Sequence, residues 1–139
     1  MPSKDKNPAE RVGHLPNTVT RKILIAKLVP SERVLDQDAV KKAKRSISSG
    51  NTKPPRVVRI GRYYYVRNGN HRIMAAKLRG LRNIDCRIEA RKRRPNVSDF
   101  EEDDCKEAVK LGYLGFSKVS VTSKKEKDQA YDEEEELLF

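Results

Sequence analysis

The stretch of the sequence with the most chemical potential is Asn68-Gly69-Asn70-His71-Arg72. It lies where a β-rich run gives way to a helical pattern, and the free backbone N–H groups at a helix N-terminus favour an anion such as phosphate. Gly69 lets the backbone approach a ligand closely, and Asn68 or Asn70 could cap the helix. His71 adds a titratable donor and Arg72 a guanidinium fork, which together suit phosphate oxygens. The stretch predicts a phosphate site, while Asn-Gly before a helix is also ordinary turn chemistry.

Other basic side chains could bring nucleic acid to this turn, because Lys and Arg make many of the contacts to a phosphate backbone. We predict DNA contacts from Lys53, Arg59, Arg67, Arg91, Lys92, Arg93 and Arg94. The run over 91–94 would position DNA without reading its sequence, and it serves equally well as a solubilising linker.

The elements that must position these residues are predicted from hydrophobic periodicity and turn residues. We expect a strand over 19–29, a helix from Asp36 or Asp38 to Gly50, a hairpin over 56–66, a helix over about 71–79, a strand over 84–88 and a helix over 99–111. Strands and helices that alternate in this way are typical of a small α/β or α+β domain.

Charge is distributed unevenly along the 139 residues, which together carry a formal net charge of +11. Residues 1–96 hold 25 Lys or Arg against 7 Asp or Glu, whereas residues 97–139 hold 6 against 13. We therefore divide the chain into a flexible basic arm (1–18), a folded domain (19–90), a basic hinge with a helix (91–116) and an acidic disordered tail (117–139). The basic body favours a polyanionic partner, and excess Lys also serves solubility.

Several classes of protein are excluded by composition. No apolar run approaches the roughly 20 residues of a membrane span, and no hydrophobic stretch follows the N-terminal charges, so we expect a cytoplasmic protein without a membrane partner. Cys86 and Cys105 lie far apart without a Cys-x-x-Cys pair, which excludes a zinc site of ordinary spacing. The acidic tail could compete for the basic body or simply solvate the chain, and its tip, Leu137-Leu138-Phe139, could dock on a protein partner.

A series of short motifs follows in one order along the chain: Lys53-Pro54, Tyr63-Tyr64-Tyr65-Val66, Asn68-Gly69-Asn70-His71-Arg72, Ala75-Ala76-Lys77 and Gly80. In this order the chain resembles the ParB/sulfiredoxin superfamily, also described as ParB-like nuclease domains, over about residues 19–90. The resemblance implies a small α/β (α+β) domain with a mixed sheet.

The resemblance also implies roles for individual residues. Gly69, His71 and Arg72 would bind nucleotide or DNA phosphate, and Glu32, just after Pro30, would face the same pocket. In a nuclease, Glu32 or His71 would act as acid or base, with Mg²⁺ or Mn²⁺ neutralising charge. Carboxylates are scarce in the body of the chain, so the metal ligands stay unassigned.

The chain departs from the family pattern at two positions of the central motif. Sulfiredoxins have a reactive cysteine where this chain has Asn70, which argues against reduction of sulfinic acid by that route. Kinase-like members have an acidic residue where this chain has Asn68, which removes a carboxylate. The second nucleotide motif and the helix-turn-helix domain of partition ParB proteins are not found.

These observations lead to one expected function and two alternatives. We expect a DNA-binding protein that contacts phosphates, with nuclease activity as an open question. The first alternative is a nucleotide-dependent phosphotransferase or nucleotide hydrolase that binds ATP, ADP or CTP in the same pocket. The second is a non-enzymatic accessory protein of plasmid or virus type.

Overall fold

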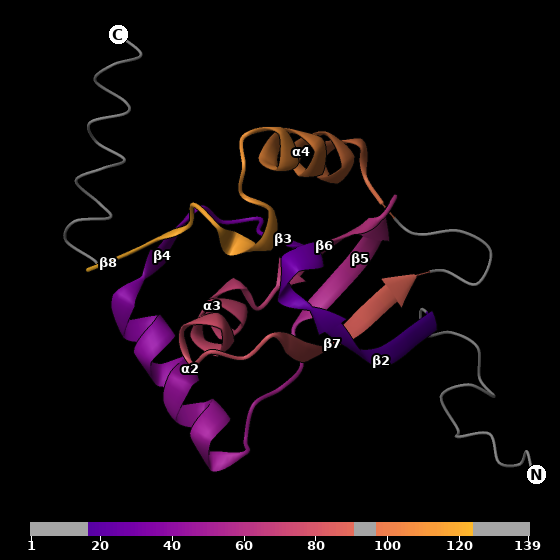
Figure 1. The fold of residues 1–139 in the computed structure, drawn as a ribbon. Coiled ribbons are helices and arrows are strands. Elements are labelled where there is room, and N and C mark those ends of the chain that lie inside the picture. The colour runs from indigo at the N-terminus through magenta and orange to yellow at the C-terminus, as the bar shows by residue number, and fades with distance from the viewer. Residues whose placement is uncertain (1–16, 91–96, 124–139) are drawn as a thin grey trace, which may run out of the picture.

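The computed structural model describes residues 17–90 and 97–123. Five strands form a mixed sheet in the order β2-β7-β5-β6-β3, and β4 pairs with β8 in a second sheet (Figure 1). The strands are β2 (Asn17–Leu24), β3 (Leu28–Val29), β4 (Val34–Asp36), β5 (Arg56–Ile60), β6 (Tyr63–Asn68), β7 (Asn83–Ala90) and β8 (Ser120–Thr122). The helices are α2 (Gln37–Ser49), α3 (Asn70–Leu78) and α4 (Asp99–Lys110), and 3₁₀ turns cover Ile25–Lys27 and Leu114–Phe116.

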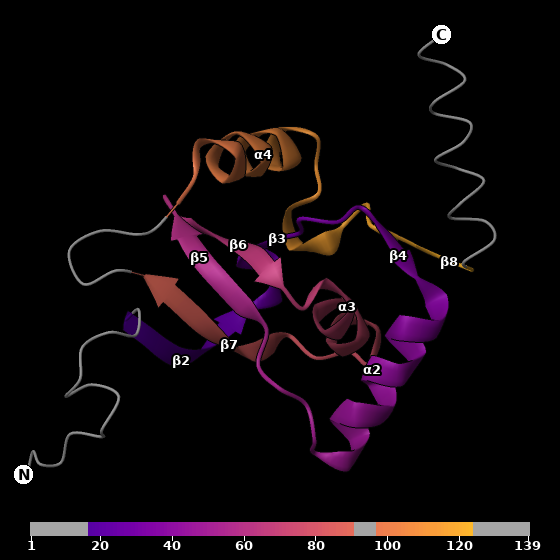
Figure 2. The same ribbon diagram turned by 180° about the vertical axis from the view of Figure 1, so that it is seen from behind.

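Helices cover both faces of the central β5–β6 hairpin. Val57 of β5 packs in the cluster formed with α3, whereas its neighbour Val58 packs in a second cluster with Cys105 and Ala108 of α4. Adjacent residues of a strand point to opposite faces, so α3 and α4 lie on opposite sides of the sheet. Figures 1 and 2 show α2 on the far side of α3 from the sheet, which makes α2 the outer helix on the α3 side.

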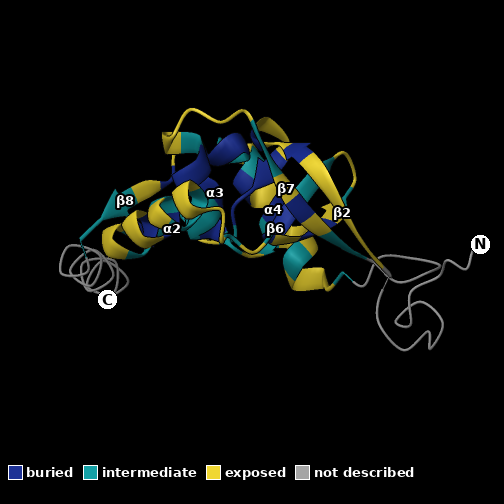
Figure 3. Ribbon diagram, turned by 90° about the horizontal axis from the view of Figure 1, so that it is seen from below, coloured by how far each residue is buried: buried dark blue, intermediate teal, exposed yellow. Residues whose placement is uncertain are grey.

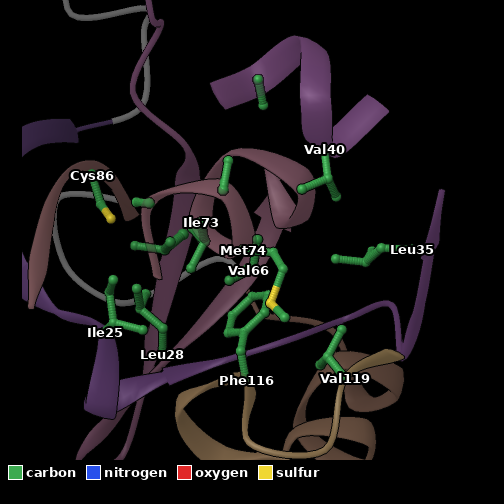
Figure 4. Close-up of a cluster of buried hydrophobic side chains, with 14 of the residues drawn as sticks. Ile25, Leu28, Leu35, Val40, Val66, Ile73, Met74, Cys86, Phe116 and Val119 are labelled. Atoms are coloured by element: carbon green, nitrogen blue, oxygen red, sulfur yellow. The ribbon is translucent and has the colours of Figure 1, made fainter. Parts of the chain in front are cut away.

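The larger hydrophobic cluster includes side chains from both ends of the described chain. Phe116 is 1% exposed and packs with Leu28, Ile73 and Met74 beneath α3 (Figure 4). Its backbone φ of 62° lies in the left-handed region, which bulky residues seldom adopt. Val119 is buried in the same cluster, so the hydrophobic core extends well beyond residue 90.

Most of the predicted elements are confirmed. The helix expected between Asp36 or Asp38 and Gly50 is α2, where the Asp36 side chain accepts from the Ala39 N–H at 3.0 Å and Gly50 ends the helix with φ 77°. The hairpin, α3, β7 and α4 lie where periodicity placed them, and α4 begins with a capping box between Ser98 and Glu101.

Two predictions differ from the structure, one about a strand and one about the tail. The strand expected over 19–29 is broken, because β2 pairs antiparallel with β7 at one edge of the sheet and β3 pairs parallel with β6 at the other. The chain has to cross between the edges, and the 3₁₀ turn at Ile25–Lys27 makes that crossing. Within the predicted tail, Ser120–Thr122 forms β8 and pairs parallel with β4. Three residues carry too little periodicity to reveal such a strand.

Candidate phosphate-binding site

The turn from β6 into α3 is built around Gly69, which is the N-cap of α3 and has φ 113°. A Cβ at this position would lie 2.7 Å from Pro55 Cβ and 2.9 Å from Pro55 Cα. Both distances are well inside van der Waals contact, so only glycine allows Pro55 to pack against the turn. The close approach places the loop before β5 beside the first turn of α3.

The prediction that Asn68 or Asn70 caps α3 is wrong, because the helix begins without a side-chain cap. Asn70 turns inward instead and is 3% exposed. Its Oδ1 accepts from the Ser31 N–H at 3.0 Å, and its Nδ2 donates to Ser31 Oγ at 2.9 Å. Asn70 therefore ties the Pro30-Ser31 turn to α3, and the opening N–H groups of the helix are left without a side-chain acceptor.

Arg72 holds together the two segments that meet at this turn. Its Nη1 donates to the Lys53 carbonyl at 2.5 Å and the Pro54 carbonyl at 3.3 Å, and its Nη2 donates to Asn68 Oδ1 at 3.1 Å. None of these acceptors is charged. Burial, followed by the neighbouring Arg56 cation, lowers the pKa of Arg72 from its ordinary value. Among the described residues, Arg72 therefore has no acidic partner at this turn.

The predicted acid and base residues lie on segments that pack together. The Asp36 N–H donates to His71 Nε2 at 3.4 Å, and Ser31 is bonded to Asn70, so the 31–36 segment lies along the first turn of α3. Glu32 is in the middle of this segment and is exposed. That Glu32 and His71 act together stays a prediction of the family resemblance.

Arg67, one of the predicted DNA contacts, is engaged elsewhere. Its Nε and Nη2 donate to the Glu101 carboxylate at 2.8 and 3.1 Å, and its Nη1 lies 3.4 Å from Glu89 Oε1. Arg56 also lies 3.5 Å from Glu89. Half-buried Arg67 thus joins β6 to α4 and β7, and its charge is met by carboxylates of the protein.

The other predicted DNA contacts are spread over the molecule. Lys53 is exposed beside the candidate site, with its carbonyl bound by Arg72. Arg59 is exposed on β5, and its Nε donates to the Gly61 carbonyl at 3.1 Å. The run over 91–94 and the tip at 137–139 lie outside the described residues.

We expect the Arg67–Glu101 contact to make stability depend on pH. The hydrogen bond from Arg67 lowers the pKa of Glu101, so the carboxylate stays ionised in the folded protein at pH values where it takes up a proton in the unfolded chain. Its contribution to stability is complete above the ordinary pKa of glutamate and is lost as the pH falls through the lowered pKa of the folded state.

Glu101→Gln tests this expectation and keeps the capping box, because glutamine also accepts from the Ser98 N–H. At neutral pH the variant is expected to lose about 1.5–3 kcal/mol of the free energy of unfolding, the usual range for a hydrogen bond to a charged group. The difference from the wild type should shrink on acidification, as measured by urea denaturation at several pH values. Equal stability of the two proteins at neutral pH would contradict the expectation.

A pocket of about 320 Å³ adjoins the candidate site across the Lys53–Pro54 segment. Its walls combine apolar and polar side chains, among them Ile47, Pro54, Pro55, Leu81, Lys22 and Lys53. Thr52 also lines the pocket, and its buried Oγ1 has no hydrogen-bond partner. Binding sites for small molecules have volumes and linings of this kind.

Sequence reasoning missed two partners of the motif. Arg56 is not among the predicted phosphate or DNA contacts, although its position just after Pro54-Pro55 places it at the start of the strand beside the turn. Ser31 is not among the predicted site residues, and its two hydrogen bonds with Asn70 join residues 39 apart in the chain. Only the tertiary fold reveals this second contact.

Within residues 17–90 and 97–123, no group of three or more His, Cys, Asp or Glu side chains is arranged to hold a metal ion. The same part of the chain contains no helix that is both long and apolar enough to cross a membrane.

Comparison with known proteins places the chain in a family. Two solved structures are similar to it, sulfiredoxin from Arabidopsis thaliana and a protein from Agrobacterium tumefaciens. The sulfiredoxin is 28% identical with a TM-score of 0.46, over 51% of this chain and 84% of that chain. The second is 15% identical with a TM-score of 0.46, over 70% of this chain and 50% of that chain. The comparison with curated proteins found no match. Residues 2–99 match the model of the ParB N-terminal domain, and the chain therefore belongs to the ParB N-terminal domain family.

Proposed function

We propose that the protein binds DNA through phosphates and that the first turn of α3 receives one of them. The observation that carries the proposal is the open helix start at Gly69, which has no side-chain cap and lies beside the guanidinium of Arg72. Unpaired N–H groups and the positive end of the helix dipole favour an anion at this place. Membership of the ParB N-terminal domain family agrees with a DNA partner.

The proposal is tested by titrating a fluorescently labelled DNA duplex with the protein at two salt concentrations. Neutralised phosphates release counterions, so affinity should fall with a log–log slope of about −0.9 for each phosphate contacted. Single-stranded DNA gives a comparison with a shallower slope of about −0.7 for each phosphate. Absence of binding, or affinity that does not respond to salt, would rule out the proposal.

Asn68→Asp separates phosphate binding from folding. The substitution keeps the acceptor for Arg72 Nη2 and makes that hydrogen bond charge-assisted, so the melting temperature should stay the same or rise. It also puts a negative charge at the helix start, where a phosphate would be repelled. We expect affinity for duplex DNA to fall about tenfold, the effect of roughly 1.4 kcal/mol. Affinity equal to that of the wild type would show that no phosphate binds at this turn.

Cleavage by Glu32 and His71 is the finer part of the proposed function, and it needs its own assay. Supercoiled plasmid is incubated with Mg²⁺ or Mn²⁺ and with wild type, His71→Ala or Glu32→Gln. Nicking that both substitutions abolish would assign cleavage to this turn. Equal nicking by all three proteins would point to a contaminating nuclease and limit the function to binding.

The pocket beside Arg72 favours nucleotide binding as the second candidate function. Its apolar walls suit a base, Lys53 supplies positive charge, and Thr52 Oγ1 has no hydrogen-bond partner. Lys22 also lines the pocket, where its Nζ lies 3.7 Å from the Asp85 carboxylate. Arg72 joins this pocket to the helix start through the Lys53 and Pro54 carbonyls. A nucleotide could therefore place its base in the pocket and its phosphates at α3.

Thermal denaturation with ATP, ADP and CTP, each added separately, tests the second candidate. A ligand that binds only the folded state raises the melting temperature, and the rise grows with the logarithm of the ligand concentration above Kd. We expect Asn68→Asp to reduce this rise through its charge and Thr52→Val to reduce it by removing the hydroxyl. If no nucleotide raises the melting temperature of the wild type, the pocket does not bind these nucleotides.

A further inference from the structure

The exposed face of α2 carries a concentration of positive charge that the candidate site does not use. The helix contains four basic side chains, Lys41, Lys42, Lys44 and Arg45, and its only acidic residue is Asp38 in the first turn. At about 100° for each residue, Lys41 and Arg45 lie at the centre of one face, opposite the buried Val40 and Ala43. Figure 3 shows the outward side of α2 exposed along much of its length.

Carboxylates are unevenly shared between the two sides of the molecule. On the α4 side, cations meet acidic partners, as in Arg67–Glu101, Arg33–Asp104 and Lys106–Glu102. Among the described residues, the ion pairs include none to a basic side chain of α2 or α3. The α2–α3 layer therefore presents positive charge that no carboxylate of residues 17–90 or 97–123 pairs with.

This arrangement has a cost within the helix itself. Lys41 with Arg45 is a pair four residues apart, and Lys41 with Lys44 and Lys42 with Arg45 are pairs three residues apart. Like charges at these spacings destabilise a helix by about 0.2–0.5 kcal/mol each. A bound polyanion would turn this repulsion into attraction.

Arg79, just after α3, extends the charged face. Its Nη1 donates to Ser48 Oγ and to the Lys44 carbonyl at 3.4 Å, which places its guanidinium on the C-terminal half of α2. A shallow hollow at this point is lined by Lys44, Arg45, Ser48, Ser49 and Arg79. Serine hydroxyls beside guanidinium groups are a common combination in phosphate contacts.

The charged face and the candidate site are neighbours. Helix α2 starts at Gln37, directly after Asp36, whose N–H donates to His71 in the first turn of α3. From there α2 extends about 20 Å, at a rise of 1.5 Å for each of its 13 residues. Duplex DNA carries one charge for about every 1.7 Å of its axis, so one duplex can supply phosphates along this whole length.

We propose that Lys41, Lys42, Lys44, Arg45 and Arg79, here called the basic ridge, form a second surface that binds the phosphate backbone of duplex DNA. The inference rests on the proposed function, because it extends the DNA track from the first turn of α3 along α2. The ridge contacts backbone and reads no bases, so it contributes affinity independent of sequence.

A pair of matched variants tests the inference. The triple variant Lys41→Gln, Lys42→Gln and Arg45→Gln removes three of the five charges of the ridge. The control Lys106→Gln, Lys110→Gln and Lys118→Gln removes the same number of charges from the α4 side. The ridge variant should lose at least tenfold in affinity for a labelled duplex at low salt, and its salt slope should become shallower by about 2–3 units. The control should retain affinity within about threefold.

The outcomes separate the ridge from the helix start. If wild type binds DNA and both triple variants bind equally, the ridge is not a DNA surface, while the proposed function stands. If the ridge variant loses affinity for DNA and Asn68→Asp binds DNA as tightly as the wild type, the ridge is supported and the phosphate site at α3 is ruled out. If wild type does not bind DNA, both proposals are wrong. Melting temperatures confirm that each variant is folded, and neutralising the ridge relieves repulsion within α2.

Discussion

Gly69→Ala is expected to lower the free energy of unfolding by about 2–5 kcal/mol, a large share of the 5–15 kcal/mol typical of a folded domain. Two costs add at this residue. A non-glycine residue at φ 113° is strained, and the added Cβ would meet Pro55 at 2.7 and 2.9 Å. The nearby atoms include the Pro55 backbone, so the clash cannot be relieved by turning a flexible side chain.

Gly80→Ala is the matched control, because Gly80 has φ 84° and an added Cβ would meet nothing within 4 Å. Gly80→Ala should lower the free energy of unfolding through backbone strain alone, by about 1–2 kcal/mol. Urea denaturation of both variants measures the difference, which reports the clash with Pro55. If the two alanines cost the same, the contact between Gly69 and Pro55 does not constrain the turn.

Phe116→Ala is expected to cost about 3–5 kcal/mol, the usual range for truncating a fully buried phenylalanine. Phe116 is 1% exposed in the cluster that supports α3, and alanine would leave a cavity beside Met74 and Leu28. The left-handed φ of residue 116 strains alanine much as it strains phenylalanine, so the loss reports packing alone.

Phe100→Ala removes the same side chain from a position on α4 that is 74% exposed, and it should change stability by less than about 0.5 kcal/mol. Denaturation monitored by circular dichroism compares the two variants. A cost at Phe116 as small as that at Phe100 would mean that residues after α4 contribute little to the core.

Local signals were sufficient to predict most of the helices and strands. Asp36 and Gly50 bracket α2 as N-cap and C-cap, and Ser98 with Glu101 opens α4, so these boundaries could be predicted from a few adjacent residues. The pairing of strands that lie far apart in the sequence could not be predicted in this way. Nothing between Ile23 and Val29 shows that the chain leaves one edge of the sheet and joins the other, because the partners of those strands lie far along the chain.

In the candidate site, too, local features could be predicted and long-range contacts could not. The helix start at Gly69 could be predicted from the motif and from the family resemblance. The inward turn of Asn70 could not be predicted, because its partner is Ser31. Nor could the engagement of Arg67, since its acidic partner Glu101 is 34 residues away. Side-chain types suggest which chemistry is available, and the fold decides which groups are already occupied.

The pairing of β4 with β8 bears on how the protein folds during synthesis. Leu35 in β4 pairs with Val121 in β8, so this contact closes only after nearly all of the described chain has been made. Phe116 reaches the core equally late. Contacts between such distant residues are slow to form because the intervening chain must first be ordered. A nascent chain that ends near residue 90 would expose the surface beneath α3 until the final segment emerges from the ribosome.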